Sequence, residues 1–320
     1  MYEHALATVR LKAMSNWRSR MDKGRLCGEP ELVADLACAV GENPLWYATE
    51  RKLLWTDITG GFLYRYDPKN GAHERFYTGR PVGGFTIQQD GSLLLFKDRG
   101  TIASWSGPDE ITVVSEIPAE RELRFNDVIA DPIGRVFCGT YTEGRKGRLY
   151  RLDIDGTLTM ILDGIGCSNG MAFTSDRSKF FYTDSFAHNI YQFDFDEPTG
   201  ELSNQTVFYS VPESHGFPDG CTLDSEDHLW FALFGGAAIV RLDPKGRVVA
   251  TIPMPAKNIT SLTFGGEDRK DIYVTSEGGL ARTNIDPHAG ALFRIRSKIS
   301  GRPEFCSRIS LTDKQANRKQ

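Results

Sequence analysis

A repeat of 40 to 48 residues constrains the fold of this 320-residue chain more than any other feature. Six apolar, aromatic-rich strand candidates recur, with centres at Leu54, Leu94, Val136, Phe181, Leu229 and Ile272. The steps between successive centres are 40, 42, 45, 48 and 43 residues. A period in this range is typical of propeller blades and similar arrays. The repeat therefore predicts six strand-rich units in succession.

A second strand-like run follows most of these candidates and alternates apolar and polar side chains at period two, as half-exposed strands do. Examples are Phe62–Asp67, Arg148–Asp153, Asn189–Asp194 and Ile239–Asp243. These runs lead into turn-forming residues, such as Asp67-Pro68-Lys69-Asn70-Gly71. No helical stripe of useful length follows residue 30. The pattern predicts an all-β fold, a six-bladed β-propeller.

The ends of such a ring are expected to meet, because an open ring would expose sheet edges. The run Glu31–Cys38 reads as a strand that precedes the first full blade. We expect it to complete the last blade beside Ile272–Val274 and Ala291–Ile295. The predicted propeller spans residues 31–307. Residues 1–30 are expected to be an extension, loose or with a short helix, and residues 308–320 a C-terminal tail.

Composition excludes several classes of protein. With 40% hydrophobic residues the chain can bury a sizeable core, and its net charge of −4 gives no basic field for nucleic acid. No apolar run approaches the roughly 20 residues that span a bilayer. The first 30 residues lack the apolar core of a secretory signal, so the expected location is the cytoplasm. None of the six cysteines has C-x-x-C spacing, which disfavours zinc ribbons and redox motifs.

Four short segments place a carboxylate or a carboxamide beside Gly or Pro, within or next to strand-like runs. They are Gly41-Glu42-Asn43-Pro44, Arg124-Phe125-Asn126-Asp127, Ser168-Asn169-Gly170 and Pro218-Asp219-Gly220. Each one alone is typical of an ordinary turn. From Glu42 through Asn126 and Asn169 to Asp219, however, the spacings are 84, 43 and 50 residues, or one such residue per repeat or pair of repeats. This register favours a common location on the propeller axis.

Two acids and two Asn amides, if brought together, form an all-oxygen site for one hard divalent cation per chain. Ca²⁺ is the expected ion, Mg²⁺ and Mn²⁺ suit the same ligands, and Zn²⁺ is tolerated with carboxylate support. His215 lies shortly before Asp219 and is a candidate for the pocket lining, the alternative being an exposed turn residue. His188, after Asp184-Ser185, is a similar candidate.

The ordered set of motifs resembles the senescence-marker-protein-30, gluconolactonase and luciferin-regenerating-enzyme family, also called regucalcin-like proteins. The resemblance covers about residues 31–300 and extends to Cys138-Gly139-Thr140, Tyr182-Thr183-Asp184-Ser185 and Thr260–Gly266. It implies that Glu42, Asn126, Asn169 and Asp219 hold a divalent metal on the axis. It also implies that Arg124 contacts the substrate and that Asp219 doubles as the general base for a metal-activated water. The implied reaction is the opening of a sugar lactone ring to the aldonic acid.

Two departures from the family pattern bear on the substrate. The family often follows Gly-Thr with a pair of acids, whereas this chain has Glu143 followed by Gly144. Glu143 is therefore the expected substrate contact in this run. Val128 stands where a small Gly is common after Arg-x-Asn-Asp. Both changes leave the expected metal site intact and leave open which sugar lactone is bound.

Four other functions are possible alternatives to a lactonase. A nucleophilic hydrolase is disfavoured because an all-β fold lacks the strand-to-helix elbow that a Gly-x-Ser-x-Gly nucleophile uses. No His-x-x-x-His pattern supports a zinc peptidase. A non-catalytic propeller that binds calcium or a protein partner remains an alternative, as does an organophosphate or aryl-ester hydrolase on the same scaffold. The expected partner is a small sugar lactone, with no nucleic acid or membrane, and the chain is expected to be a monomer or a weak homo-oligomer.

Overall fold

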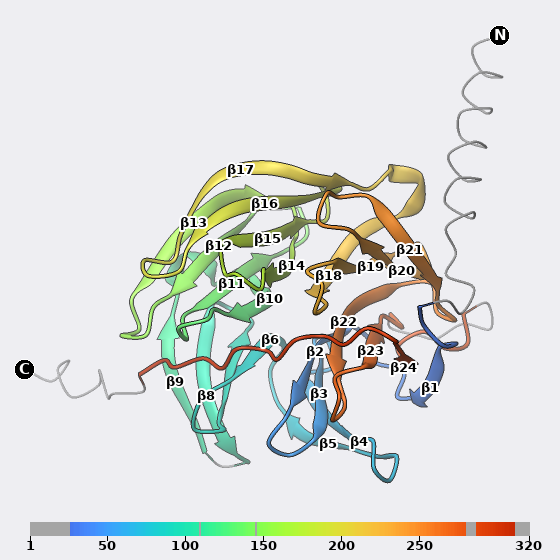
Figure 1. The fold of residues 1–320 in the computed structure, drawn as a ribbon. Helices are drawn as coiled ribbons and strands as arrows, with labels where there is room; N and C mark the ends of the chain where they lie inside the picture. Colours follow the sequence, from blue (N-terminus) through green and yellow to red (C-terminus); the bar gives the residue numbers. More distant parts are fainter. Residues whose placement is uncertain (1–25, 109, 145, 280–285, 311–320) are drawn as a thin grey trace, which may run out of the picture.

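Six four-stranded antiparallel sheets surround a central axis and form a six-bladed β-propeller (Figure 1). The computed structural model describes residues 26–108, 110–144, 146–279 and 286–310. The predicted all-β propeller is thereby confirmed. Most of the predicted N-terminal extension, residues 1–25, lies outside the described residues.

Each blade is a meander whose first strand lies nearest the axis. The innermost strands are β2 (Gly41–Tyr47), β6 (Val82–Ile87), β10 (Arg124–Ala130), β14 (Ser168–Phe173), β18 (Phe217–Leu223) and β22 (Ile259–Gly265). The second strands are β3 (Lys52–Asp57), β7 (Leu93–Lys97), β11 (Val136–Tyr141), β15 (Lys179–Asp184), β19 (Leu229–Phe234) and β23 (Asp271–Ser276). These second strands contain the six apolar runs that revealed the repeat.

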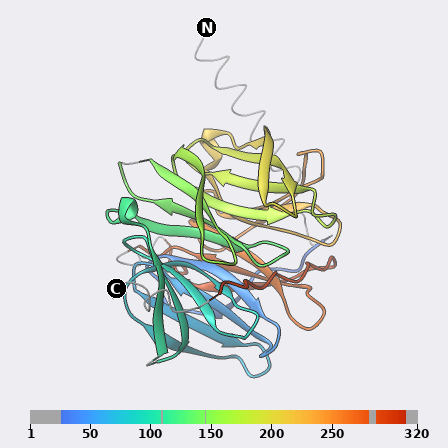
Figure 2. The ribbon, with the colours of Figure 1, turned by 90° about the vertical axis from the view of Figure 1, so that its left-hand side faces the viewer.

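The two outer layers complete the blades. The third strands are β4 (Phe62–Asp67), β8 (Thr101–Gly107), β12 (Gly147–Leu152), β16 (Asn189–Asp196), β20 (Ala238–Leu242) and β24 (Leu292–Arg296). The outermost strands are β5 (Ala72–Thr78), β9 (Glu110–Glu116), β13 (Leu158–Ile165), β17 (Glu201–Ser210), β21 (Val248–Pro253) and β1 (Glu31–Ala34). Figure 2 shows the twist of these sheets from the side. Two short 3₁₀ turns, η1 (Pro118–Glu120) and η2 (Glu213–His215), precede β10 and β18.

The ring closes through its last blade, as the sequence predicts. Strand β1 pairs with β24 in the order β22-β23-β24-β1, with Leu32 opposite Phe293. The N-terminal strand therefore belongs to the same sheet as the last strands of the chain. This pairing joins segments more than 250 residues apart and covers the edge that β24 would otherwise expose.

The core of the described residues divides into six apolar clusters, each between two neighbouring blades. Between the third and fourth blades, Phe137 packs with Phe173, Phe180 and Phe195, with ring centroids 5.1 to 6.3 Å from its own. The second strands contribute to clusters on both of their faces, so they are buried almost throughout. This explains why they read as continuous apolar runs.

A C-terminal strap, Ser297–Ser310, crosses one end of the propeller from the last blade toward the opposite side (Figure 1). Within the strap, Gly301 forms an antiparallel β-bridge with Asp224, and Ser307 forms a parallel β-bridge with Gln88. Arg308 N donates to Gly134 O at 2.8 Å, and Ile309 is only 3% exposed. The described residues 308–310, which the sequence assigned to the tail, therefore pack on the propeller. Within the part of the chain that the structure describes, no helix has the length and apolar character to cross a membrane.

Candidate functional site

The four predicted metal ligands converge at one end of the axis, where the innermost strands begin. Glu42, Asn126, Asn169 and Asp219 lie in the first three residues of β2, β10, β14 and β18. Their exposed fractions are only 3 to 7%. The two remaining inner strands carry Gly83 and Thr260 as their second residues. Four of the six blades thus contribute a side-chain oxygen.

A β-bulge in every inner strand lies at this level. The registers shift between Glu42 and Leu45, between Phe125 and Val128, and between Pro218 and Cys221, and the other three inner strands shift at equivalent points. A bulge interrupts the strict alternation of side chains and re-aims them. Adjacent residues such as Asn126 and Asp127 can therefore both direct their side chains toward the axis.

The glycines of the motifs are required by the close approach of the next blade. A Cβ on Gly170 would lie 2.6 Å from Asp219 O, and one on Gly220 would lie 2.1 Å from Ser261 Oγ. On β6, a Cβ on Gly83 would lie 1.8 Å from Phe125 O. These residues sit within strands, so packing around the axis and not turn formation explains them.

A chain of hydrogen bonds links three neighbouring blades through the site. The Arg124 guanidinium donates to Asn126 Oδ1, and Asn126 Nδ2 donates to Asn169 Oδ1 at 2.5 Å. Asn169 Nδ2 in turn donates to Ser185 Oγ at 2.8 Å, and that hydroxyl donates to Pro218 O at 2.6 Å. Each amide oxygen retains a second lone pair. The chain fixes both amides while leaving them able to bind a cation.

Two buried acids hold the loops that lead into the ligand-bearing strands. The Asp57 carboxylate accepts the backbone N–H groups of Ala39 and Val40, both at 3.0 Å, just before Glu42. The Asp184 carboxylate accepts those of Gly166 and Cys167, also at 3.0 Å, just before Asn169. In the first and fourth blades, the second strand thus positions the start of the inner strand.

The centre of the site concentrates negative charge. Burial raises the pKa of Glu42 well above its ordinary range, and the nearby Asp127 and Asp219 raise it further. Burial raises the pKa of Asp219 in the same way, and the negative charges of Asp127 and Glu277 raise it further. Arg124 is a cation that faces these carboxylates and lowers both pKa values. One guanidinium does not balance several buried acids.

A divalent cation fits this arrangement. Among the described residues, Asp219 Oδ1 and Asp127 Oδ1 are buried and have no hydrogen-bond partner, which is costly for carboxylate oxygens. A hard cation would supply the missing positive charge, and the donors around it are all oxygens. Glu42, Asn126, Asn169 and Asp219 are the residues that would hold it.

Asp127 is a functional candidate that the sequence analysis did not place in the site. Burial raises its pKa to about 7, although Arg124 opposes the shift. The residue also lines an axial cavity of about 80 Å³ beneath the ligands, which Arg302–Phe305 of the C-terminal strap close from the other end. The sequence signal for Asp127 is its place in the Arg-x-Asn-Asp run. In a regular strand, however, its side chain would point to the face opposite that of Asn126.

Two of the three predicted substrate residues, Arg124 and Glu143, line the same groove, and His215 does not line it. Arg124, Tyr141 and Glu143 border one groove, and the Arg124 guanidinium lies over the Tyr141 ring at 5.0 Å from its centroid. Glu143 is exposed on the loop after β11. His215 is half-buried in η2, two residues before the strand that carries Asp219, and burial lowers its pKa. His188 instead stacks on Phe217, with 4.5 Å between ring centroids.

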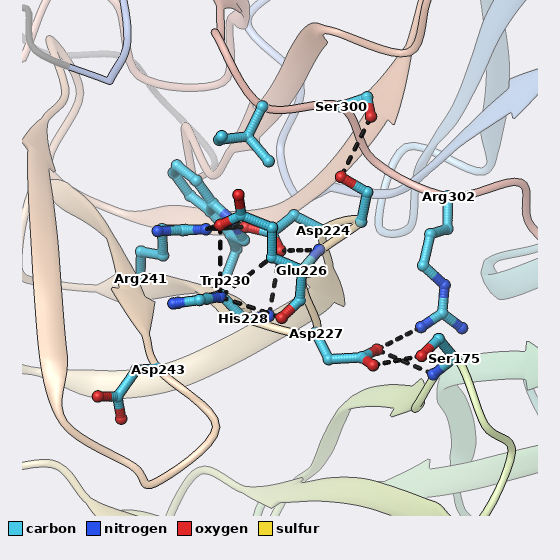
Figure 3. Close-up of polar contacts among 12 residues, drawn as sticks. Ser175, Asp224, Glu226, Asp227, His228, Trp230, Arg241, Asp243, Ser300 and Arg302 are labelled. Carbon is cyan, nitrogen blue, oxygen red and sulfur yellow. Dashed lines mark hydrogen bonds and ion pairs between the residues drawn. The ribbon is translucent and has the colours of Figure 1, made fainter.

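A second acidic group, Asp224, Glu226 and His228, brings its ligand atoms within 4.8 Å of one another (Figure 3). Asp224 Oδ2 already accepts Trp230 Nε1 and Arg241 Nε, each at 2.8 Å. Its Oδ1 accepts the backbone N–H groups of Glu226 and His228. The Arg241 guanidinium also pairs with Glu226 at 2.8 Å. Arginine thus supplies the positive charge here, and the group braces the turn between β18 and β19.

The run Gly166-Cys167-Ser168-Asn169-Gly170 matches the letters of a Gly-x-Ser-x-Gly nucleophile motif. Ser168, however, is fully buried as the first residue of the inner strand β14. The motif requires an exposed serine on a strand-to-helix turn. The run is therefore part of the axial strand and not a nucleophile elbow.

Comparison with known proteins shows that the chain is similar to proteins named as lactonases and regucalcins. Residues 40–278 match the family model described as SMP-30/Gluconolactonase/LRE-like region. The chain is similar to the pentonolactonase XacC of Haloferax volcanii, with 43% identity over 289 residues that cover 87% of this chain and 98% of the relative. Regucalcin of Danio rerio is 35% identical over 281 residues, which cover 83% of this chain and 94% of that protein.

Solved structures show the same fold. A luciferin-regenerating enzyme has a TM-score of 0.80 at 26% identity, with 88% of this chain and 99% of the other covered. A calcium-binding protein, regucalcin of Agrobacterium tumefaciens, has a TM-score of 0.83 at 22% identity, with 88% and 98% covered.

Proposed function

Because this chain belongs to the SMP-30/gluconolactonase/LRE-like family, we propose that it is a metal-dependent lactonase that hydrolyses a sugar lactone to the aldonic acid. The observation that carries the proposal is the Asp219 carboxylate, buried on the axis with one oxygen unpartnered and with Arg124 nearby. A relative with 43% identity over nearly its whole length is named a pentonolactonase. Five-carbon aldonolactones are therefore the first substrates to test.

The proposed cofactor is one divalent cation, Ca²⁺ first, held by Glu42, Asn126, Asn169 and Asp219. When bound, such a cation polarises a carbonyl and lowers the pKa of water. The negative charge of the pocket supports a cation of charge two, and its oxygen donors support a hard one.

The chain's own residues then account for the reaction. Asp219 accepts a proton from the attacking water as the new C–O bond forms at the lactone carbonyl. Arg124 stabilises the negative charge that develops on the carbonyl oxygen, because its guanidinium already lies in the same pocket. The ring C–O bond breaks, and the departing alkoxide takes the proton that Asp219 accepted, which gives the hydroxyl of the aldonic acid and restores the carboxylate. Glu143 and His215 are proposed to contact the hydroxyl groups of the sugar.

A calcium-binding propeller without catalysis is the second candidate. The acid-rich axial pocket would hold a cation in either case, and a structure with the same fold is described as a calcium-binding protein. This candidate predicts tight Ca²⁺ binding with no turnover of any lactone. The cytoplasmic location and the monomeric or weakly oligomeric state remain predictions.

One experiment tests both candidates. Chelator-stripped protein is assayed with xylono-, arabinono- and gluconolactone by a pH indicator that reports the acid released. Ca²⁺, Mn²⁺, Mg²⁺ and Zn²⁺ are each added back singly, and the spontaneous hydrolysis rate is subtracted. We expect activity that depends on an added metal and is lost in Asp219→Asn. Metal binding by calorimetry without turnover of any lactone would refute the lactonase and favour the second candidate.

A further inference from the structure

Glu277 is an acid that neither the sequence analysis nor the proposed mechanism uses. It follows directly after β23 in the sixth blade, at the end of the axis where the metal ligands lie. Glu143 follows β11 in the third blade, two residues after that strand ends. The third and sixth blades are diametrically opposed in a six-bladed ring. The two acids therefore lie on opposite sides of the ring, Glu143 lining one groove and Glu277 a second hollow beside Asn258.

Glu277 contacts Asn258, the residue before the inner strand β22, and its charge acts on the groups of the axial site. After burial and Asp127, Glu277 is the next influence that raises the pKa of Asp219. Burial raises the pKa of Glu277 itself, while Asn258 and Arg124 lower it. Burial raises the pKa of Tyr141, and the charges of Glu143 and Glu277 both raise it further. The charge of Glu277 therefore acts on Asp219 and on Tyr141, and that of Arg124 acts on Glu277.

The backbone around Glu277 is held firmly. Glu277 N donates to Asn258 O at 2.9 Å, and Gly278 N and Gly279 N donate to Cys38 O and Ala39 O, both at 3.0 Å. A Cβ on Gly278 would lie 2.8 Å from Cys38 O, so this close contact requires glycine. The segment is therefore tied to the loop that leads to Glu42.

The carboxylate of Glu277 keeps acceptor capacity for a ligand. Asn258 Nδ2 donates to Glu277 Oε2 at 3.5 Å, which is long for a hydrogen bond. A carboxylate offers about four lone-pair positions, so most of them remain available. The residue is half-buried, as a wall of a pocket mouth would be.

We propose that Glu277 is a specificity-determining residue that accepts hydrogen bonds from the hydroxyl groups of a polyhydroxylated lactone, opposite Glu143. The inference rests on the proposed lactonase function. It also accounts for the family acid that is missing at Gly144, because Glu277 supplies a second carboxylate from the opposite blade. A substrate held between two carboxylates must carry hydroxyl donors on both sides, which favours sugar lactones over aryl esters or plain alkyl lactones.

The test compares two lactones in full-length wild type, Glu277→Gln and Glu277→Ala. Xylono-1,4-lactone carries ring and side-chain hydroxyls, while γ-butyrolactone has the same five-membered ring without them. For both variants we expect KM for xylonolactone to rise about tenfold or more, as the loss of hydrogen bonds to a charged group implies. The value of kcat should stay within about twofold, because the lost hydrogen bonds hold the bound substrate and the transition state equally. The value of kcat/KM for γ-butyrolactone should not change. Glu110→Gln, an exposed acid on the outer strand β9, is the matched control for charge.

Two further readouts separate the alternatives. Ca²⁺ affinity by calorimetry should fall only a few-fold in Glu277→Gln, because a neighbouring charge is lost but no ligand is. A loss of Ca²⁺ affinity as large as that in Asp219→Asn, an equal fall on both lactones, or no change on either would overturn the inference. If the wild type hydrolyses neither lactone, the proposed function fails by itself. The role of Glu277 is then decided by the binding of xylitol, a polyol without an ester: weaker binding in Glu277→Gln supports it, and equal binding refutes it.

Discussion

The stability of the metal-free protein should fall as pH rises from 5 to 8. Burial raises the folded-state pKa of Glu42, Asp127 and Asp219 above their values in the unfolded chain. The folded protein therefore binds more protons than the unfolded one in this range. Stability is fully present below the unfolded pKa values, near 4, and is lost as pH rises through the folded ones.

Asp127 sets the scale of this effect. Its pKa rises from 3.8 to about 7, a difference of about three units. At 1.36 kcal/mol per unit, the whole shift corresponds to about 4 kcal/mol of stability, and the two units or so that lie between pH 5 and the folded pKa account for about 3 kcal/mol. For a domain of this size 1 kcal/mol corresponds to roughly 2 °C, so the melting temperature should fall by roughly 6 °C between pH 5 and pH 8. Glu42 and Asp219 act in the same direction.

Acids outside the axial site do not mask this fall in stability with pH. The pKa of Asp243 is lowered to about 2 by its hydrogen bond with Arg247, so its stabilisation is complete above about pH 5. His215 opposes the trend, because its lowered pKa favours folding as pH rises. It is more exposed than the axial acids, so its contribution should be smaller.

The assay is a melting curve at pH 5, 6, 7 and 8 at constant ionic strength, with chelator or with saturating Ca²⁺. Bound Ca²⁺ should remove most of the decline, because it stabilises the ionised carboxylates, so the Ca²⁺-induced shift should grow with pH. Asp127→Asn should flatten the metal-free curve. A metal-free melting temperature that stays constant or rises over this range would refute the reasoning, as would a Ca²⁺ shift that does not depend on pH.

Three further predictions address catalysis, binding and the strap. Asp219→Asn should abolish turnover and weaken Ca²⁺ binding, whereas Asn169→Ala should weaken Ca²⁺ binding and leave the base in place. Near-normal activity of Asp219→Asn would exclude Asp219 as the base. Arg124→Lys keeps the charge but loses the planar fork, so kcat/KM should fall about 10- to 100-fold with Ca²⁺ affinity almost unchanged. An equal loss of Ca²⁺ affinity would mean that Arg124 chiefly braces Asn126. Ile309→Ala should cost about 2–4 kcal/mol, or several degrees in melting temperature, because this side chain of the strap is buried in the core between the second and third blades. An unchanged melting curve would separate the strap from the cooperative unit.

The blades were predictable from the sequence because their second strands are buried on both faces. Such strands read as apolar runs, for example Phe180–Tyr182, and they recur at the blade period. The inner strands were harder to recognise as strands. Residues such as Gly170 and Pro218 are turn formers by propensity, and only the approach of a neighbouring blade explains Gly170 within a strand.

Which side chains meet at the axis was only partly predictable. The four expected ligands converge because each blade repeats the same geometry. Asp127 was not placed there because a bulge in β10 overrides the alternation that a regular strand would impose. Glu277 was missed because its relation to Glu143 crosses the whole ring, and no local pattern in the sequence records which blades face each other.

Acidic residues alone do not identify a cation site in this fold, because the surrounding donors decide their role. Asp131 Oδ1 accepts three backbone N–H groups, from Ile133, Gly134 and Arg135, so this buried acid stabilises a turn. Asp224 is satisfied by Trp230, Arg241 and backbone amides in the same way. At Asp219 Oδ1 no such donor is present among the described residues, although the group is equally hidden from water. Burial without donors is unfavourable for an ionised carboxylate, so binding a cation would restore the balance at the axial site, where Asp127 Oδ1 and Asp219 Oδ1 both lack a donor.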